Sequence, residues 1–231
     1  ALGEVANAPI TIHCAGRTDA GVHAFAQIVH LDTPVVRSCK AWVIGGNTNL
    51  PRDIRIHWAA PLASDFHARF SAQARRYTYV IANTPIRPAL LHSQTTWHRR
   101  PLDALAMHTA AQALLGERDF SSFRAASCQS TTPMRNVKFI EVRRQGNLVV
   151  LEILANAFLH HMVRNIAGAL LAIGDGRKQI GWVAELLAER DRRKGAETAP
   201  AGGLYLVDVE YSARFGLPQT PYGPMLLGTT S

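Results

Sequence analysis

Residues 137–155 (VKFIEVRRQGNLVVLEILA) and 158–173 (FLHHMVRNIAGALLAI) decide the fold class. In the first stretch, two runs rich in β-branched residues flank Gln145-Gly146-Asn147, a pattern that predicts an antiparallel hairpin. In the second stretch, apolar residues recur at helical spacing and predict an amphipathic helix over 158–173. A hairpin and a helix, without regular strand–helix alternation along the chain, indicate an α+β protein with a largely antiparallel sheet.

The flanking sequence continues this mixture of strands and helices. The opening residues 1–7 (ALGEVAN) are typical of the end of a helix. A helix is predicted over 101–115, where Pro101 and Asp103 lie in the first turn and Gly116 follows the end. A second helix is predicted over 182–188, and strands are predicted over 9–15, 25–31, 54–58, 76–81 and 204–209.

Pro85, Pro88 and Pro101 cluster near the middle of the chain, and proline-rich stretches commonly separate compact parts. We therefore predict a domain boundary between residues 83 and 100. The predicted organisation is an N-terminal half, a C-terminal half and an irregular, exposed or mobile tail, over 1–90, 91–211 and 212–231.

The chain is basic, with 25 Lys and Arg residues against 17 Asp and Glu residues and a net charge of +8. Such a surplus of positive charge favours a polyanionic partner, and nucleic acid is the first candidate. Hydrophobic residues make up 47% of the chain, which excludes global disorder. The most apolar stretch, 157–173, is interrupted by histidines and an arginine, so no membrane span is expected. Three scattered cysteines suit a reducing compartment, and we expect a cytoplasmic protein.

Motifs for phosphate loops, dinucleotide binding, serine hydrolases and zinc proteases are absent from the sequence, so we expect no cofactor. The ten histidines raise the question of a metal. His160 and His161 are adjacent within the predicted helix, and neighbouring helical side chains diverge by about 100°. We therefore expect solvated or RNA-facing histidines there and no metal site.

The most unusual segment is residues 14–24 (CAGRTDAGVHA), which lies between two predicted strands. Two glycines bracket Arg17, Thr18 and Asp19, and glycine permits the tight geometry that presses a side chain toward a ligand. Arg17 lies two residues before Asp19 and would favour its ionised form. Taken alone, an Asp followed by Ala-Gly is more often an ordinary turn held by local hydrogen bonds than a catalytic loop.

This segment resembles the signature of the pseudouridine synthases, and most closely that of the tRNA pseudouridine synthase A family. Further blocks resemble the family in the same order along the chain, from about residue 10 to about residue 211. They are NTNLP at 47–51, DFHARFSAQARRYTY at 65–79, GERDFSSF at 116–123, FLHHMVRNIAG at 158–168 and APAGGLYL at 199–206.

The resemblance implies two ferredoxin-like (RRM-like) halves that form one extended, mostly antiparallel sheet with helices on its outer faces. It also implies a homodimeric isomerase that converts uridine to pseudouridine at positions 38, 39 and 40 of the tRNA anticodon stem-loop. Members usually begin with a strand, a basic glycine-containing segment and a helix before the equivalent of ALGEVAN. Those pieces are missing from the printed chain, which bears on its RNA contacts more than on its chemistry.

The resemblance assigns the catalytic aspartate to Asp19, the active-site tyrosine to Tyr77 and the arginine that pairs with the aspartate to Arg164. Asp19 could add to uracil C6, remove a ribose proton or stabilise a cationic sugar, and the sequence leaves all three open. Tyr77 could stack on the uracil or accept the C5 proton, although a tyrosine is a poor base without help. Tyr79, on the same strand face, is expected to be structural.

A target uridine must leave its stack to be reached, and we assign nucleotide extrusion and phosphate contact to Arg17. Basic side chains next to the site blocks predict the RNA path, because they neutralise phosphates. The RNA-binding candidates are Arg17, His23, Arg75, Arg76, His160 and His161.

Two other functions remain open from the sequence. One is an RNA-binding or chaperone protein on the same fold with an idle site. The other is a hydrolase of N-glycosidic bonds, which would use the same carboxylate together with water.

Overall fold

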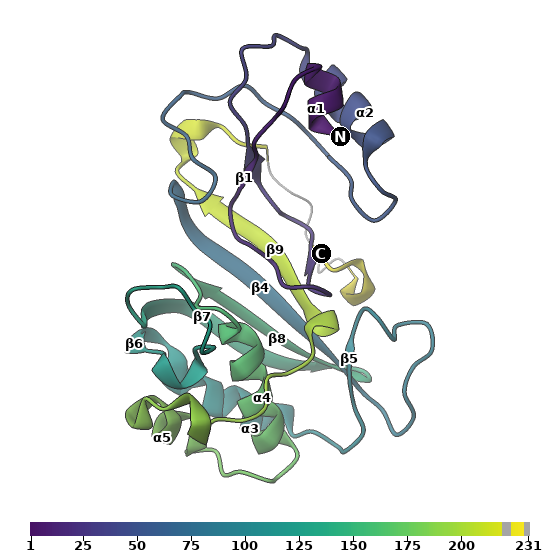
Figure 1. Ribbon diagram of the computed structural model, residues 1–231. Helices are drawn as coiled ribbons and strands as arrows, with labels where there is room; N and C mark the ends of the chain where they lie inside the picture. Colours follow the sequence, from purple (N-terminus) through teal and green to yellow (C-terminus); the bar gives the residue numbers. More distant parts are fainter. Residues whose placement is uncertain (219–222, 229–231) are drawn as a thin grey trace. The chain divides into compact units, whose positions relative to one another are not determined.

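A computed structural model describes residues 1–218 and 223–228, which divide into two compact units (Figure 1). The first unit comprises residues 1–17, 27–72 and 210–218. The second comprises residues 18–26, 73–209 and 223–228. Each unit is described by itself below. No helix among the described residues has the length and apolar character that a bilayer span requires.

The second unit is built on a seven-stranded sheet with the order β2-β9-β4-β8-β7-β6, and β5 pairs with β4 outside this path. Pairing is antiparallel from β4 through β8 and β7 to β6, and parallel between β2 and β9 and between β4 and β5. The predicted α+β class is therefore confirmed, with a mixed sheet. The strands are β2 (His23–Ala24), β4 (Ala72–Asn83), β5 (Thr96–His98), β6 (Gly116–Asp119), β7 (Met134–Gln145), β8 (Leu148–Ala155) and β9 (Leu204–Tyr211).

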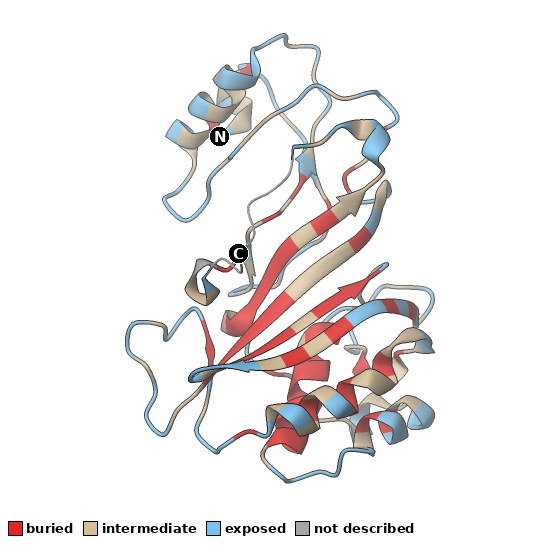
Figure 2. Cartoon of the chain, turned by 180° about the vertical axis from the view of Figure 1, so that it is seen from behind, coloured by how far each residue is buried: buried red, intermediate tan, exposed pale blue. Residues whose placement is uncertain are grey.

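Three helices pack against one face of this sheet: α3 (Ala104–Ala111), α4 (Met162–Gly174) and α5 (Trp182–Glu189). Alternate strand residues join the helices in one core because successive side chains of a strand point to opposite faces. Figure 2 shows the buried residues concentrated in the sheet and in the helix packed on it. Fully buried members of this core include Tyr79, Ile81, Leu151, Ile153, Met162, Ile166 and Leu170.

The first unit contains two short helices, α1 (Leu2–Ala6) and α2 (Cys39–Asn49), and an antiparallel pair formed by β1 (His13–Cys14) and β3 (Val29–His30). Helix α2 is capped by Ser38, whose hydroxyl accepts the Ala41 amide at 3.2 Å. Glycine in α2 allows α1 to approach closely, since a Cβ on Gly45 would lie 2.9 Å from the Val5 side chain.

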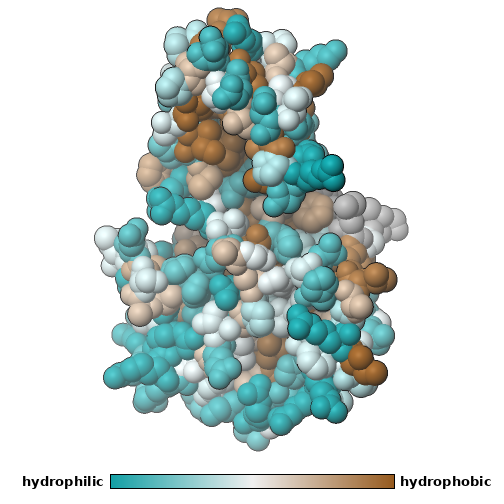
Figure 3. Space-filling model, turned by 45° about the vertical axis from the view of Figure 1, so that its right-hand side comes forward, coloured by the Kyte–Doolittle hydropathy of each residue, from teal (hydrophilic) through white to brown (hydrophobic). Residues whose placement is uncertain are grey.

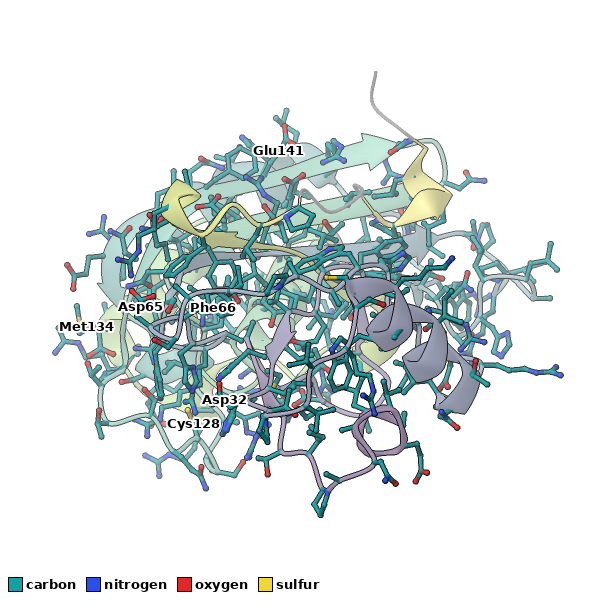
Figure 4. The ribbon with its side chains drawn as sticks, turned by 90° about the horizontal axis from the view of Figure 1, so that it is seen from above. Asp32, Asp65, Phe66, Cys128, Met134 and Glu141 are labelled. Carbon is teal, nitrogen blue, oxygen red and sulfur yellow. The ribbon has the colours of Figure 1, made fainter. Side chains whose placement is uncertain are left out.

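Aromatic packing organises the remainder of the first unit. The ring of Phe66 lies 5.2 Å from that of Tyr211 and 5.0 Å from that of Phe215. The neighbouring Asp65 forms an ion pair with Arg214 at 2.8 Å, and Figure 4 shows Asp65 and Phe66 side by side. Figure 3 shows apolar side chains gathered in the upper part of its view, while hydrophilic side chains cover most of the lower part.

Several predicted elements are confirmed. The hairpin is formed by β7 and β8, with Gly146 in the turn at a φ of +56°. The strand expected over 76–81 is the centre of the longer β4, and the helix expected over 182–188 is α5. Asp103 caps α3 by accepting the Ala106 amide at 2.9 Å, so that helix starts at Ala104 and not at Pro101.

The strand predicted over 54–58 is wrong. Asn47 occupies both backbone groups of Ile56, because its Oδ1 accepts the Ile56 amide at 2.7 Å and its Nδ2 donates to the Ile56 carbonyl at 2.8 Å. A side chain thus replaces the neighbouring strand as the hydrogen-bond partner. The strands expected over 9–15 and 25–31 are reduced to β1 and β3.

The helix predicted over 158–173 begins four residues late, at Met162. His161 has a φ of +61°, in the left-handed region, and this conformation cannot continue a right-handed helix toward the N-terminus. Residues 158–161 are therefore not helical, and a turn at His160 and His161 leads into α4. The predicted tail over 212–231 lies partly outside the described residues, and within them Ala213–Phe215 and Met225–Leu227 form single 3₁₀ turns.

One side of α4 is covered by the segment 196–199, which approaches the helix backbone closely. A Cβ placed on Gly168 would overlap the Glu197 carbonyl oxygen. The buried Asn165 completes this contact, because its Oδ1 accepts the Thr198 hydroxyl at 2.7 Å and its Nδ2 donates to the Phe123 carbonyl at 2.8 Å. Glycine at 168 is thus required by packing.

Gly168→Ala is expected to destabilise the protein by about 1–3 kcal/mol, although alanine favours a helix, because the Glu197 carbonyl must move. Urea unfolding measures the change. Gly181→Ala is the matched control: Gly181 has helical φ and ψ, and its Cβ would meet nothing closer than 3.9 Å. A Gly168→Ala protein as stable as the control would show that segment 196–199 does not constrain α4.

Candidate active site

Asp19 sits at the first position of a tight turn. The Val22 amide donates to the Asp19 carbonyl at 3.0 Å, and Gly21 at the third position has a φ of +82°. A turn with a positive φ at that position favours glycine, since a Cβ would be strained there. Directly after the turn, His23 in β2 pairs with Tyr205 in β9. The turn is therefore anchored to the edge of the sheet.

The start of α4 supplies the facing side chains. His160 and His161 precede the helix, and the left-handed conformation of His161 turns both rings to the same side. Their ring centroids lie 4.0 Å apart. The expectation that the two rings diverge by about 100° is wrong, because it assumed that both residues were helical.

The carboxylate of Asp19 is held by three basic side chains. Arg164 Nη1 donates to Asp19 Oδ2 at 2.9 Å, and His161 Nε2 lies 3.1 Å from the same oxygen. His160 Nε2 lies 3.3 Å from Asp19 Oδ1. The ion pair predicted between Arg164 and Asp19 is thus formed. Since 29% of the Asp19 side chain remains exposed, the carboxylate is both oriented and accessible.

Arg164 is itself fixed by the segment that crosses α4. Its Nε donates to the Ala199 carbonyl at 2.8 Å, and the Ala199 amide donates to the Arg164 carbonyl at 3.1 Å. Only 16% of the Arg164 side chain is exposed. The guanidinium therefore approaches Asp19 in one fixed orientation.

His160 is held by the turn over 125–128. Its Nδ1 lies 3.0 Å from Ser127 Oγ, and its amide donates to Cys128 Sγ at 3.4 Å. The Ala125 amide donates to the His160 carbonyl at 3.0 Å. Figure 4 labels Cys128. These bonds fix the ring of His160, whose side chain is 39% exposed, over Asp19 Oδ1.

Burial lowers the pKa of His161, and the neighbouring His160 lowers it further. Asp19 acts in the opposite direction but does not outweigh them. His161 is therefore a neutral imidazole at neutral pH, and Arg164 supplies the positive charge on Asp19 Oδ2.

The two tyrosines of β4 have different surroundings. Tyr77 is partly buried, and its ring packs edge-on against Phe158 at 5.0 Å between centroids. Phe158 lies two residues before His160, so it connects Tyr77 to the turn that carries the histidines. Tyr79 is fully buried, and its hydroxyl bonds to Thr96 Oγ1 at 2.6 Å and to the Pro200 carbonyl at 2.7 Å. Burial raises the pKa of Tyr79, which fits its expected structural role.

The other RNA-binding candidates lie in several places. Arg17 is exposed in the first unit. His23 stacks on Tyr205 at 4.8 Å, with its Nε2 3.0 Å from the Ser93 carbonyl. Arg75 donates to the Asn156 carbonyl at 3.1 Å, and Arg76, on the opposite face of β4, pairs with Glu152 at 2.5 Å. His160 and His161 are the two candidates that contact Asp19.

Sequence reasoning missed three contributors to the site. Phe158 was placed in the helix, whereas it lies before the helix and orients Tyr77. Ser127 and the Ala199 carbonyl orient His160 and Arg164, and nothing in their local sequence indicates this. Such contacts depend on segments that are distant in sequence.

Comparison with known proteins gives the family. A family model described as tRNA pseudouridine synthase matches residues 110–212, which include α4 and the segment that fixes Arg164. The chain is 57% identical over 236 residues to tRNA pseudouridine synthase A of Aeromonas salmonicida, covering 100% of this chain and 88% of the relative. The chain belongs to the tRNA pseudouridine synthase family.

Further relatives carry the same name as the first. The chain is 55% identical over 227 residues to tRNA pseudouridine synthase A of Actinobacillus pleuropneumoniae, with 98% of this chain and 87% of the relative covered. It is 56% identical over 227 residues to the protein of the same name from Citrobacter koseri, with 98% and 84% covered. Membership of this synthase family places the chain among the isomerases.

Proposed function

We propose that the chain isomerises uridine to pseudouridine in the tRNA anticodon stem-loop, at positions 38, 39 and 40, with Asp19 as the essential carboxylate. The observation that carries this proposal is the Asp19 carboxylate, held by Arg164 at 2.9 Å yet still partly exposed. Family membership supports tRNA pseudouridylation. The resemblance of residues 14–24 to the family signature supports the role of Asp19 and the choice of positions.

The reaction breaks the C1′–N1 bond and joins C1′ to C5 of the same uracil. The proton leaves C5 and N1 gains one, so the product is an isomer and no redox step is involved. In the site, Asp19 Oδ2 is occupied by Arg164 and His161, whereas Oδ1 contacts His160. Oδ1 is therefore the oxygen that we assign to the nucleotide. Addition to C6, removal of a ribose proton and stabilisation of a cationic sugar all use this oxygen.

We assign Tyr77 to the uracil ring, because its packing against Phe158 fixes the plane of an aromatic ring near the histidine turn. Arg17, Arg75 and the two histidines are proposed to contact RNA, and Arg17 to assist extrusion of the nucleotide. A homodimer and two ferredoxin-like halves remain proposals that rest on the resemblance.

Incubation of the purified protein with unmodified tRNA transcripts tests the function. We expect pseudouridine at positions 38, 39 and 40, detected by carbodiimide labelling and primer extension. Free uracil in the supernatant would instead show an N-glycosidic hydrolase. Binding of tRNA with neither product would show an RNA-binding protein with an idle site.

A further inference from the structure

We propose that Asp19, His160 and His161 form a binding site for a divalent transition-metal ion such as Zn²⁺, which inhibits the protein by occupying the carboxylate. The inhibition rests on the proposed function, whereas the binding does not. These three residues are a group whose possible ligand atoms all lie within 4.8 Å of one another. The ion is an inhibitor here and has no part in the reaction.

The distances fit a tetrahedral ion. His160 Nε2 lies 3.3 Å from Asp19 Oδ1, and His161 Nε2 lies 3.1 Å from Asp19 Oδ2. Zinc bonds to imidazole nitrogen and carboxylate oxygen are about 2.0–2.2 Å long, which separates adjacent tetrahedral ligands by about 3.3 Å. An ion can therefore enter between the two rings and the carboxylate with small adjustments. The open side leaves room for a water as the fourth ligand.

The imidazoles are oriented as metal ligands usually are. A ligating histidine generally donates its second ring N–H to an oxygen, and Ser127 Oγ lies 3.0 Å from His160 Nδ1. In that tautomer Nε2 directs its lone pair toward Asp19. Side-chain exposures of 39% for His160 and 28% for His161 give an ion access from solvent.

Arg164 opposes the ion, because its guanidinium lies 2.9 Å from Asp19 Oδ2 and repels a second cation. Arg192 adds positive charge near His161. These charges limit affinity and also provide a diagnostic variant. Removing the charge at position 164 should strengthen metal binding, whereas an ordinary catalytic or structural role of the arginine gives no such gain.

The described residues contain a second group of histidines, His13, His30 and His67, with ring centroids 4.4–5.4 Å apart. One ring nitrogen is engaged in two of them: His30 Nδ1 accepts the Ala68 amide at 3.1 Å, and His67 Nδ1 accepts the Arg69 amide at 3.1 Å. This group is therefore a matched control: its imidazoles lie close together, yet it is not among the described groups whose possible ligand atoms converge.

Titration of the metal-free full chain with Co²⁺ at pH 7.5 tests the site, because Co²⁺ replaces Zn²⁺ and its absorption reports geometry. We expect one ion per chain with intense tetrahedral bands and no sulfur-to-cobalt charge transfer. His161→Asn and Asp19→Asn should weaken binding at least about tenfold, whereas His67→Asn should retain it. Thermal unfolding confirms that each variant is folded.

A further variant tests whether the ion binds next to Arg164. Arg164→Gln should bind Co²⁺ at least about tenfold more tightly, because the guanidinium that repels the ion is gone. Loss of binding in His67→Asn, or no gain in Arg164→Gln, overturns the site. Binding without any pseudouridine formation by the metal-free protein would overturn the proposed function and leave the metal site intact.

Discussion

Asp19→Asn is expected to abolish pseudouridine formation, with kcat lowered by about four orders of magnitude or more. Asparagine has the size of aspartate and keeps an oxygen that can accept the Arg164 N–H group, so the turn and α4 should keep their positions. It lacks the negative charge that all three chemical routes of Asp19 require. The loss should therefore fall on the chemical step and leave folding and most tRNA binding intact.

Single-turnover kinetics with a tRNA transcript measure the loss, and filter binding measures tRNA affinity. Asp191→Asn is the matched control, because Asp191 also pairs with an arginine, Arg193 at 2.7 Å, and lies outside the site. The control should turn over at the rate of the parent protein. Appreciable turnover by Asp19→Asn would remove Asp19 from its role.

Arg164→Ala is expected to lower kcat by about 10²-fold and to change tRNA affinity only a few-fold. The side chain is largely buried and does two things: it holds Asp19 Oδ2 at 2.9 Å and the Ala199 carbonyl at 2.8 Å. Without it, the carboxylate is free to rotate, and the fixed orientation toward the nucleotide is lost. The effect should therefore appear in kcat more than in KM.

Arg164→Lys separates charge from geometry. Lysine keeps the positive charge but cannot donate to Asp19 and Ala199 from one planar group, so its activity should lie between those of the parent and Arg164→Ala. Arg193→Ala, which breaks an exposed ion pair with Asp191, is the control for loss of an arginine. An unchanged rate in Arg164→Ala would show that the ion pair does not orient the catalytic group.

The sequence predicts the second unit better than the first. The β7–β8 hairpin has a strong local signal, because β-branched runs flank a turn containing Gly146. Helix α2 of the first unit was not predicted, because Gly45 and Gly46 in the middle of Cys39–Asn49 are typical of a turn. Those glycines serve packing against α1 and Ile56, which local sequence does not report.

The candidate active site could be predicted from local sequence only in part, for a different reason. Local sequence indicates only that Asp19 lies in a tight, glycine-bounded loop; its pairing with Arg164 came from the resemblance to a family. The two residues are separated by 145 positions, and no periodicity connects them. The histidine pair was misplaced for a local reason, since the left-handed backbone of His161 has no clear sequence signal. A non-glycine residue adopts that conformation only when its surroundings hold it there.

The parallel pairing of β2 with β9 has a consequence for biosynthesis. The ribosome makes the Asp19 turn well before Leu204–Tyr211, the strand that anchors it. At about 5–20 residues per second, the nascent chain spends several seconds or more with this turn made but unanchored. Until that strand is made, the turn that carries Asp19 lacks the β2–β9 pairing that holds it to the sheet.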